Sequence, residues 1–447
     1  MNSSLKSFLS LMIGVFAATE IHLVGNIAIS ELILSFVAPF TFLFGYKKLR
    51  ADGFMPLIGL FVLTLLGCII ASIVNHTDFQ FVIRGLAAIY VTLAALICSH
   101  GLLRDDFSRV RWFFLGYAIS NVINIYIFQR GGSIYMANSD LINETRIEAT
   151  LGSVLFWVER LPHWLYVPIR GWYMSTPLLY SAAAPLVVAG VCLFASAGSG
   201  RSAALSALLT FALLIIGRKS SRSLQFIRKH FFVCICVLSC VALGGAKAYQ
   251  YFAWTGALGE SGVRKIEEQT KSGSGPLAIL FSARVDFFAG LYCAVKNPIV
   301  GYGPWAVDED GVAEGFMRKY VTEENYQRYM EMVRASLITG FKRMVIPSHS
   351  CIVGFWTWYG IFGLLLWLYI IRLYWKTFTL YAISYPPWYG CLASILPVVV
   401  WDALFSPFGH RVFMGYFFAM CLMLKAVYGQ RLPPGGTSHR YNAGEYE

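Results

Sequence analysis

The sequence contains few charged residues, and this scarcity excludes most classes of soluble protein. Only 13% of its 447 residues are Asp, Glu, Lys or Arg, whereas 57% are hydrophobic, and the mean hydropathy is +0.60. Soluble domains carry about a quarter charged residues, because their surface has to face water. The composition therefore excludes a soluble enzyme, a disordered protein and a nucleic-acid-binding protein, although the net charge is +12.

The cysteines form no pattern that is typical of a disulfide framework or a metal site. Most of the ten, such as Cys68 and Cys98, lie within apolar runs, where cysteine behaves as a small hydrophobic residue. Cys234, Cys236 and Cys240 are close in sequence, but their apolar run contains no histidine. We therefore predict neither a metal site nor a cofactor.

Apolar runs that are long enough to cross a bilayer, which takes about 20 residues, occur along most of the chain. Eleven lie near 8–24, 27–45, 54–74, 81–99, 112–129, 175–195, 203–217, 231–248, 349–371, 388–405 and 412–428. A twelfth is predicted within 150–170, because Arg111 and Arg218 should both face the cytoplasm and only three runs separate them. The alternative merges 175–217 into one kinked span with a re-entrant segment. The chain is thus predicted to be an all-α polytopic membrane protein with about 12 transmembrane helices and both termini in the cytoplasm.

The predicted spans divide the chain into four parts. These are the N-terminal helices over 1–248, a large periplasmic loop over 249–348, the C-terminal helices over 349–428 and a flexible cytoplasmic tail over 429–447. Within the loop, aromatic residues between Gly315 and Arg343 recur at helical spacing among charges, which predicts an amphipathic helix. That helix either lies on the membrane surface or over a cavity, or packs on its neighbours as an ordinary two-faced helix.

The net positive charge follows the predicted topology. The segments assigned to the cytoplasm account for the whole excess of +12, as expected from the preference of Lys and Arg for cytoplasmic loops. The large loop is neutral, with eleven basic and eleven acidic residues over 249–348. An anion site on the periplasmic side must therefore be built from individually placed arginines.

Three ionisable residues near the predicted periplasmic surface are candidates for catalysis. His349 lies where the large loop re-enters the membrane, and a neutral imidazole there can accept a proton near pH 7. The alternative is a hydrogen-bonded histidine at a helix start, with Ser348 or Ser350 as the N-cap. Arg201 and Arg284 carry guanidinium forks that suit phosphate oxygens, but a snorkelling Arg201 or a pair between Arg284 and Asp286 also fits the sequence.

The context of these residues resembles a known family. The pattern His349-Ser350, nine residues, Gly360-x-x-Gly363 is similar to the H-[N/S/Q]-x9-G-x-x-G signature of the O-antigen ligase and O-antigen polymerase family. The order of features is also similar, with a Ser-Gly-Arg link at Arg201, then Arg284 followed by N-P-x-x-G-x-G over 297–303, then the histidine motif. The resemblance covers about 175–371, nearly half of the chain. It is weaker at Arg201, because Gly200 replaces the serine expected directly before the arginine.

The resemblance implies a GT-C-like glycosyltransferase in the bacterial inner membrane, with its active site facing the periplasm. The donor would be a glycan on undecaprenyl diphosphate, and an acceptor sugar hydroxyl would attack its anomeric carbon with inversion. On this sequence, His349 would take the acceptor proton or orient that hydroxyl, while Arg201 and Arg284 would bind the leaving diphosphate. The arginines would take the place of a metal ion.

Four further residues are predicted as substrate contacts. In the last periplasmic link, Arg411 is a candidate phosphate ligand and His410 a candidate substrate contact, although a turn that anchors two helices is slightly favoured. Arg170 either stacks on sugar rings or belongs to an interfacial aromatic belt, which is the favoured interpretation. Arg84, near the outer start of a span, is expected to face the same cavity. The acidic run Asp308-Glu309-Asp310 is interpreted as solvated.

The acceptor distinguishes two activities within this family. A polymerase would extend another lipid-linked repeat, whereas a ligase would transfer the glycan to lipid A–core. The lack of a feature dedicated to lipid A slightly favours an O-antigen or exopolysaccharide polymerase, with membrane lipids and a chain-length regulator protein as further partners. The competing class is a polysaccharide or lipid transporter, which predicts paired half-repeats and broken helices at the bilayer centre.

The predicted crossing at 150–170 can be tested with a topology reporter. A reporter fused after residue 199 should read periplasmic, because the additional crossing moves this link to the outer face. A cytoplasmic signal would contradict the crossing and would remove Arg201 from a periplasmic site.

Overall fold

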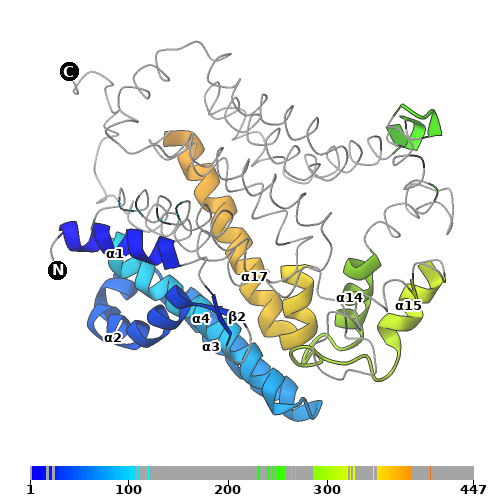
Figure 1. Ribbon diagram of the computed structural model, residues 1–447, viewed down its shortest axis with the longest axis horizontal. Coiled ribbons are helices and arrows are strands. Elements are labelled where there is room, and N and C mark those ends of the chain that lie inside the picture. The colour runs from blue at the N-terminus through cyan, green and yellow to red at the C-terminus, as the bar shows by residue number, and fades with distance from the viewer. Residues whose placement is uncertain are drawn as a thin grey trace.

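The computed structural model describes residues 3–16, 20–22, 26–105, 285–320 and 350–384, together with scattered positions at 109–119, 230–267, 323–327, 346 and 403. The described chain is helical apart from one small hairpin (Figure 1). In order, its elements are α1 (Ser3–Phe16), β1 (Glu20–His22), β2 (Asn26–Ala28), α2 (Ile29–Ala51), α3 (Met55–Val74), α4 (Phe79–Leu103), α14 (Val285–Lys296), α15 (Val312–Tyr320) and α17 (Cys351–Ser384).

Four of the described helices are long and apolar enough to cross a membrane. They are α2, α3, α4 and the Cys351–Leu373 part of α17, and they correspond to the predicted runs at 27–45, 54–74, 81–99 and 349–371. This part of the chain is thus consistent with a helical membrane protein. The predicted span at 150–170 lies outside the described residues, as do most of the other runs that make up the predicted twelve.

The first predicted span, at 8–24, is wrong over its second half. Helix α1 ends at Phe16, and residues 20–22 pair antiparallel with 26–28, with Ile21 opposite Ile27. The averaged hydropathy of the run concealed Glu20 and His22, which alternate with Ile21 at the period of a strand. Both side chains are costly in the hydrocarbon core of a bilayer, so this stretch does not continue the helix.

Helices α2, α3, α4 and α17 form one core. The largest fully buried side chains, among them Phe61 on α3, Ile89 on α4 and Tyr359 on α17, lie at their contacts. A Cβ added to Gly67 on α3 would lie 2.9 Å from the carbonyl oxygen of Tyr359, so the two helices approach at backbone distance. Small residues at such contacts are typical of helix packing in membranes, where close van der Waals contact replaces the hydrophobic effect.

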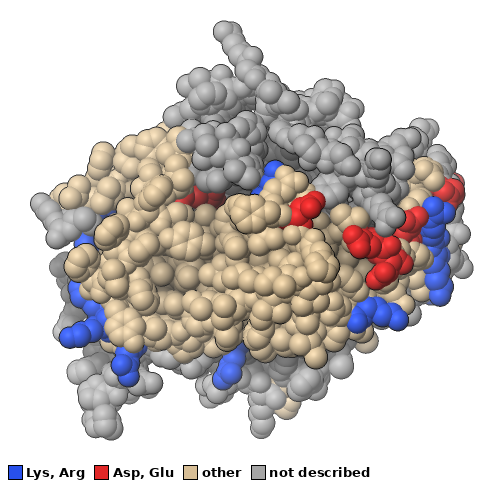
Figure 2. Space-filling model, turned by 90° about the horizontal axis from the view of Figure 1, so that it is seen from below, with Lys and Arg blue, Asp and Glu red and all other residues tan. Residues whose placement is uncertain are grey.

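The two ends of these helices carry different charges. Figure 2 shows Lys and Arg side chains gathered at the end formed by the N-terminal helices, and Asp and Glu side chains together with further Lys and Arg at the other end, with a mostly uncharged band between them. The basic end includes Lys47, Lys48 and Arg50, all exposed in the last turns of α2. Exposed phenylalanines such as Phe44, which is 88% accessible, lie on the uncharged band of α2. This distribution fits helices whose middle faces lipid and whose ends face water.

Helices α14 and α15, from the predicted periplasmic loop, pack on each other. A second cluster of buried side chains joins them, and it contains Cys293, Met317, Tyr326 and Ile346. Helix α15 begins at Val312, three residues before the predicted start of the amphipathic helix, and most of the predicted stretch beyond Tyr320 lies outside the described residues. The apolar face of α15 packs on its neighbours, which is the second of the two alternatives.

Candidate functional site

The segment 297–303 and helix α17 exchange backbone hydrogen bonds. Gly360 leaves the helical region, with φ 63° and ψ −148°, and divides α17 into two parts. The N–H of Tyr302 donates to the carbonyl of Thr357 at 2.7 Å, and the N–H of Gly303 donates to Trp358 at 3.0 Å. In an unbroken helix the N–H of Ile361 would bond to Thr357, but here it donates to the carbonyl of Ile299 at 3.0 Å. The loop thus satisfies backbone groups that the break in the helix leaves available.

Glycine is required at the points where these two segments touch. A Cβ on Gly360 would lie 2.0 Å from the carbonyl oxygen of Ile299, and a Cβ on Gly301 would lie 2.6 Å from the backbone nitrogen of Gly360. Both residues also have positive φ, a region that side chains with a Cβ rarely adopt. Gly363 is equally constrained, because its Cβ would lie 2.2 Å from the carbonyl oxygen of Phe355. Two glycine motifs that are about 60 residues apart in sequence therefore form one structural unit.

Two asparagines fix the loop from either side. The side-chain amides of Asn297 and Asn75 both donate to the carbonyl oxygen of Gly301, at 2.7 Å and 3.1 Å. Asn75 ends α3, where its amide also donates to Ala71 at 2.6 Å. The loop is therefore held between the end of α3 and the break in α17.

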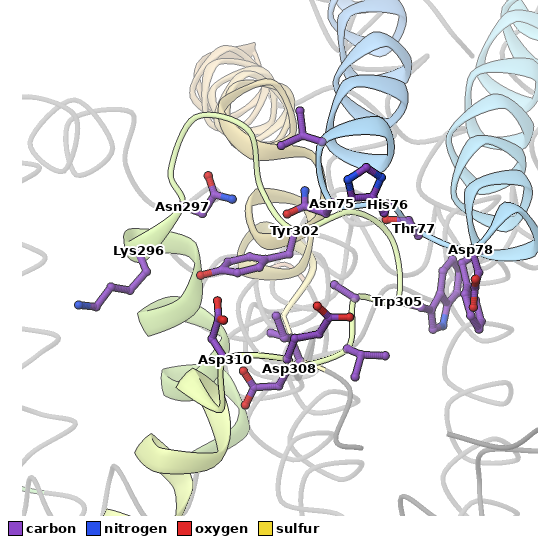
Figure 3. A pocket seen from close by; sticks show the side chains of 16 residues that line it. Asn75, His76, Thr77, Asp78, Lys296, Asn297, Tyr302, Trp305, Asp308 and Asp310 are labelled. Carbon is purple, nitrogen blue, oxygen red and sulfur yellow. The ribbon is translucent and has the colours of Figure 1, made fainter. Parts of the chain in front are cut away.

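A cavity of about 600 Å³ opens beside this loop. Figure 3 shows that its walls come from the turn between α3 and α4, the end of α14 and the segment that follows the loop. The lining residues are Val74, Asn75, His76, Thr77, Asp78, Phe81, Lys296, Asn297, Tyr302, Trp305, Ala306, Val307, Asp308, Glu309, Asp310 and Ile346.

The cavity is aromatic and acidic. Trp305, which has a positive φ of 52°, stacks on Trp358 with ring centroids 4.7 Å apart and planes 30° apart. Four carboxylates and one lysine line the space, so its charge repels anions. Burial raises the pKa of Tyr302 to about 12, with Cys293 and the nearby Asp310 adding to the effect. The phenol therefore remains a neutral hydrogen-bond donor over the physiological pH range.

Asp308 was predicted to be solvated together with its neighbours, and this prediction is wrong. Its side chain is buried, whereas Glu309 and Asp310 are exposed. Its two carboxylate oxygens accept hydrogen bonds from the backbone N–H groups of Val312 and Glu314, both at 2.8 Å. These donors have no partner within the first turn of α15, so the carboxylate caps that helix and stabilises it electrostatically.

The start of α17 is capped by Ser350. Its hydroxyl accepts a hydrogen bond from the N–H of Val353 at 3.2 Å and donates to the carbonyl of Ala403 at 2.9 Å. Ser350 is therefore the N-cap that the sequence offered as one alternative. The bond to Ala403 brings the start of α17 against the chain just before the last predicted periplasmic link.

Most of the predicted site residues lie outside the described residues. These are His349, Arg284, Arg201, Arg411, His410 and Arg170. Arg84 is described and lies in the second turn of α4, with its guanidinium 5.8 Å from the ring centroid of Phe81. Phe81 lines the cavity, but Arg84 is not among its lining residues. The prediction that Arg84 contacts substrate stays a prediction.

Several cavity residues were not identified from the sequence. Asn297 belonged to the N-P-x-x-G-x-G motif, but only as a marker of order along the chain. Asn75 and Trp305 carry no recognisable local signal, because their roles depend on segments that are distant in sequence. Asp308 stands four residues before Val312, outside the N-cap and first-turn positions by which an acidic residue usually marks a helix start.

No group of three or more His, Cys, Asp or Glu side chains suited to a metal ion occurs within the described residues. The acidic residues of the cavity are spread along its wall, and both oxygens of Asp308 are occupied by backbone N–H groups. The described cavity offers carboxylate oxygens and aromatic faces, which can contact hydroxyl groups and the apolar faces of rings.

Comparisons of the chain with family models, curated proteins and solved structures found no match.

Replacing Gly360 with alanine should destabilise the protein. The added Cβ would lie 2.0 Å from the carbonyl of Ile299, and the left-handed backbone alone costs roughly 1–2 kcal/mol. The melting temperature of the purified protein in detergent is the measurement. Gly59→Ala on α3 is the matched control, because nothing lies within 4 Å of its added Cβ. Equal melting temperatures for the two variants would contradict the close approach.

Replacing Asp308 with alanine should loosen α15. Loss of the two capping bonds is expected to cost about 1–2 kcal/mol, so backbone amides over 312–320 should exchange faster with deuterium. Asp310→Ala provides the control, since this exposed neighbour makes no capping bond. Unchanged exchange in Asp308→Ala would contradict the cap.

Proposed function

We propose that this chain is an integral membrane glycosyltransferase of the O-antigen ligase and polymerase type. It would move a glycan from undecaprenyl diphosphate to an acceptor sugar hydroxyl at the periplasmic face of the bacterial inner membrane. An O-antigen or exopolysaccharide polymerase is favoured, and a ligase that transfers the glycan to lipid A–core is the alternative. The four membrane-spanning helices support the membrane setting.

The observation that carries the proposal is the direct contact between two of the motifs on which the family resemblance rests. The N-P-x-x-G-x-G segment lies in the break made by the first glycine of the histidine motif, and each motif glycine occupies a position where a Cβ would clash. Their spacing in the sequence is thus explained by one compact unit. Such a unit would position the chain directly before Ser350, where His349 stands, relative to the chain directly before α14, where Arg284 stands.

The negative charge of the cavity favours separate binding places for the acceptor sugar and for the diphosphate of the donor. A diphosphate would be repelled by the carboxylates of Asp78, Glu309 and Asp310, whereas sugar hydroxyls can donate to them. Trp305 and Tyr302 offer aromatic surface to the apolar face of a sugar ring. We therefore assign the cavity to the acceptor sugar, and the diphosphate of the donor to Arg201 and Arg284.

The proposed reaction is a single displacement. The acceptor oxygen forms a bond to the anomeric carbon of the donor while the bond from that carbon to the phosphate oxygen breaks, which inverts the anomeric configuration. The acceptor proton moves to His349. The electron pair leaves with undecaprenyl diphosphate, whose growing negative charge Arg201 and Arg284 stabilise. Removal of one such positioned donor typically lowers the rate by about a hundredfold or more.

Substitution of the proposed catalytic residues tests the function in cells. His349→Ala and Arg284→Ala should each abolish long-chain glycan while the amount of membrane-inserted protein persists. Matched controls are Arg318→Ala, an exposed arginine on α15 that pairs with Glu314, and His439→Ala in the predicted tail. Both controls should retain full-length polymer.

The same variants separate this function from the competing classes. A scaffold for a polysaccharide machine would tolerate His349→Ala and Arg284→Ala, and full-length polymer in both variants would contradict the enzymatic assignment. Purified protein supplied with a lipid-diphosphate glycan should extend the chain without lipid A if it is a polymerase. Transfer that occurs only when lipid A–core is added would identify a ligase instead.

A further inference from the structure

A second cavity lies at the basic end of the helices, away from the acidic cavity. Its volume is about 300 Å³, and residues of α1, α2 and the end of α4 form its walls. The lining residues are Lys6, Phe40, Thr41, Phe44, Gly45, Lys48, His100, Gly101, Arg104 and Asp105. Three cations and one carboxylate thus meet two phenylalanine rings in one space. The glycosyl transfer proposed above makes no use of any of these groups.

Internal contacts hold two of the cations in place. Lys6 pairs with Asp105. The Nε of Arg104 donates to Asp52 at 2.7 Å, and its guanidinium lies 4.0 Å from Asp105. His100 lies 2.8 Å from the same oxygen of Asp52. The positions of Lys6 and Arg104 are therefore set before any ligand arrives, which lowers the entropy cost of binding an anion between them.

Lys48 differs from these two cations. It lies in the last turn of α2, is exposed, and forms no ion pair within 4 Å in the described part of the chain. Lys6 and, more weakly, Lys48 lower the pKa of Asp105, but Lys48 does so without the direct contact that Lys6 and Arg104 make with a carboxylate. The cavity therefore holds a net positive charge with one cation available for an external anion.

The apolar part of the cavity continues along the surface of α2. Phe40, Phe44 and Lys48 follow one another at intervals of one helical turn, and the two rings are 63% and 88% exposed. The distance from Phe40 to Lys48 along the helix axis is about 12 Å. Because α2 is a membrane-spanning helix, this row passes from the hydrocarbon region to the charged end. An acyl chain could lie along it with its polar end at Lys48.

We propose that this cavity binds an anionic phospholipid. The phosphate would lie between Lys48, Lys6 and Arg104, and one acyl chain would follow Phe40 and Phe44. A soluble phosphate would use the cations but leave the phenylalanine row unused, whereas an anionic phospholipid matches both. A zwitterionic lipid fits less well, because its ammonium group would be repelled by the same cations. Basic pockets between membrane helices on the cytoplasmic side are typical sites for anionic lipid headgroups, and this is the side to which the basic excess assigns the cavity.

Lipid-dependent thermal stability of the purified full-length protein tests the site. Dioleoyl phosphatidylglycerol titrated into the detergent solution should raise the melting temperature of the unsubstituted protein, and dioleoyl phosphatidylcholine should not. In Lys48→Gln, the apparent affinity for phosphatidylglycerol should fall about fivefold. The matched control is Lys47→Gln, which removes the same charge from the adjacent exposed residue outside the cavity and should leave the affinity unchanged. Neither residue is needed for an internal ion pair, so both variants should fold.

Further arms distinguish the lipid from other sources of phosphate. Phe44→Ser should also weaken the stabilisation by phosphatidylglycerol, since it removes the more exposed of the two phenylalanine rings. Glycerol 3-phosphate and inorganic phosphate should give no comparable stabilisation. The proposal is overturned if these soluble phosphates act as strongly as the lipid, if Lys47→Gln and Lys48→Gln lose equal affinity, or if Lys48→Gln binds as tightly as the unsubstituted protein. Glycan polymerisation is not measured, so the result is independent of the proposed enzymatic function.

Discussion

At Gly360 the backbone of α17 leaves the helical region. The loop 297–303 and the acidic cavity beside it depend on this break in the helix. The carbonyls of Thr357 and Trp358 bind the loop 301–303, and the N–H of Ile361 binds Ile299 in return. A buried backbone group without a partner is costly, so the break and the loop require each other. The asparagines at the ends of α3 and α14 then add their amides to Gly301. The walls of the acidic cavity follow from this arrangement, because its residues continue directly from the loop and from the end of α3.

The membrane imposes a second constraint, which separates the chemistry of the two ends. Charges are confined to the ends of the spanning helices, since burial in hydrocarbon is unfavourable. One end has an acidic, aromatic cavity that suits hydroxyl-rich rings, and the other has a basic cavity that continues into exposed phenylalanines. An acceptor sugar at the first and an anionic lipid at the second are the ligands proposed for them. The apolar core of α2, α3, α4 and α17 connects these two regions.

The glycines of this protein differ in whether their surroundings leave room for a side chain. The motif glycines tolerate no Cβ, because backbone atoms at Gly301, Gly360 and Gly363, and the hydroxyl of Thr77 at Gly303, lie within about 2–3 Å of the position it would take. By contrast, nothing lies within 4 Å of a Cβ added to Gly45 or Gly59. Substitutions at the first set should act on folding, whereas those at the lipid-facing surface act on the environment of the protein. The number of glycines in the sequence therefore does not show which of them the fold requires.

The sequence by itself determined the apolar, membrane-spanning character of four helices in the described chain and the basic charge at one end of them. These features depend on the hydropathy and charge of local segments, which chain order fully specifies. It also supplied the motif glycines and Ser350 as an N-cap. Only the tertiary structure decided that Gly301 lies against Gly360, that Asn75 donates to the carbonyl of Gly301, and that Phe81 lines the acidic cavity. These outcomes depend on contacts between segments distant in sequence, and no local pattern records which backbone groups will need a partner.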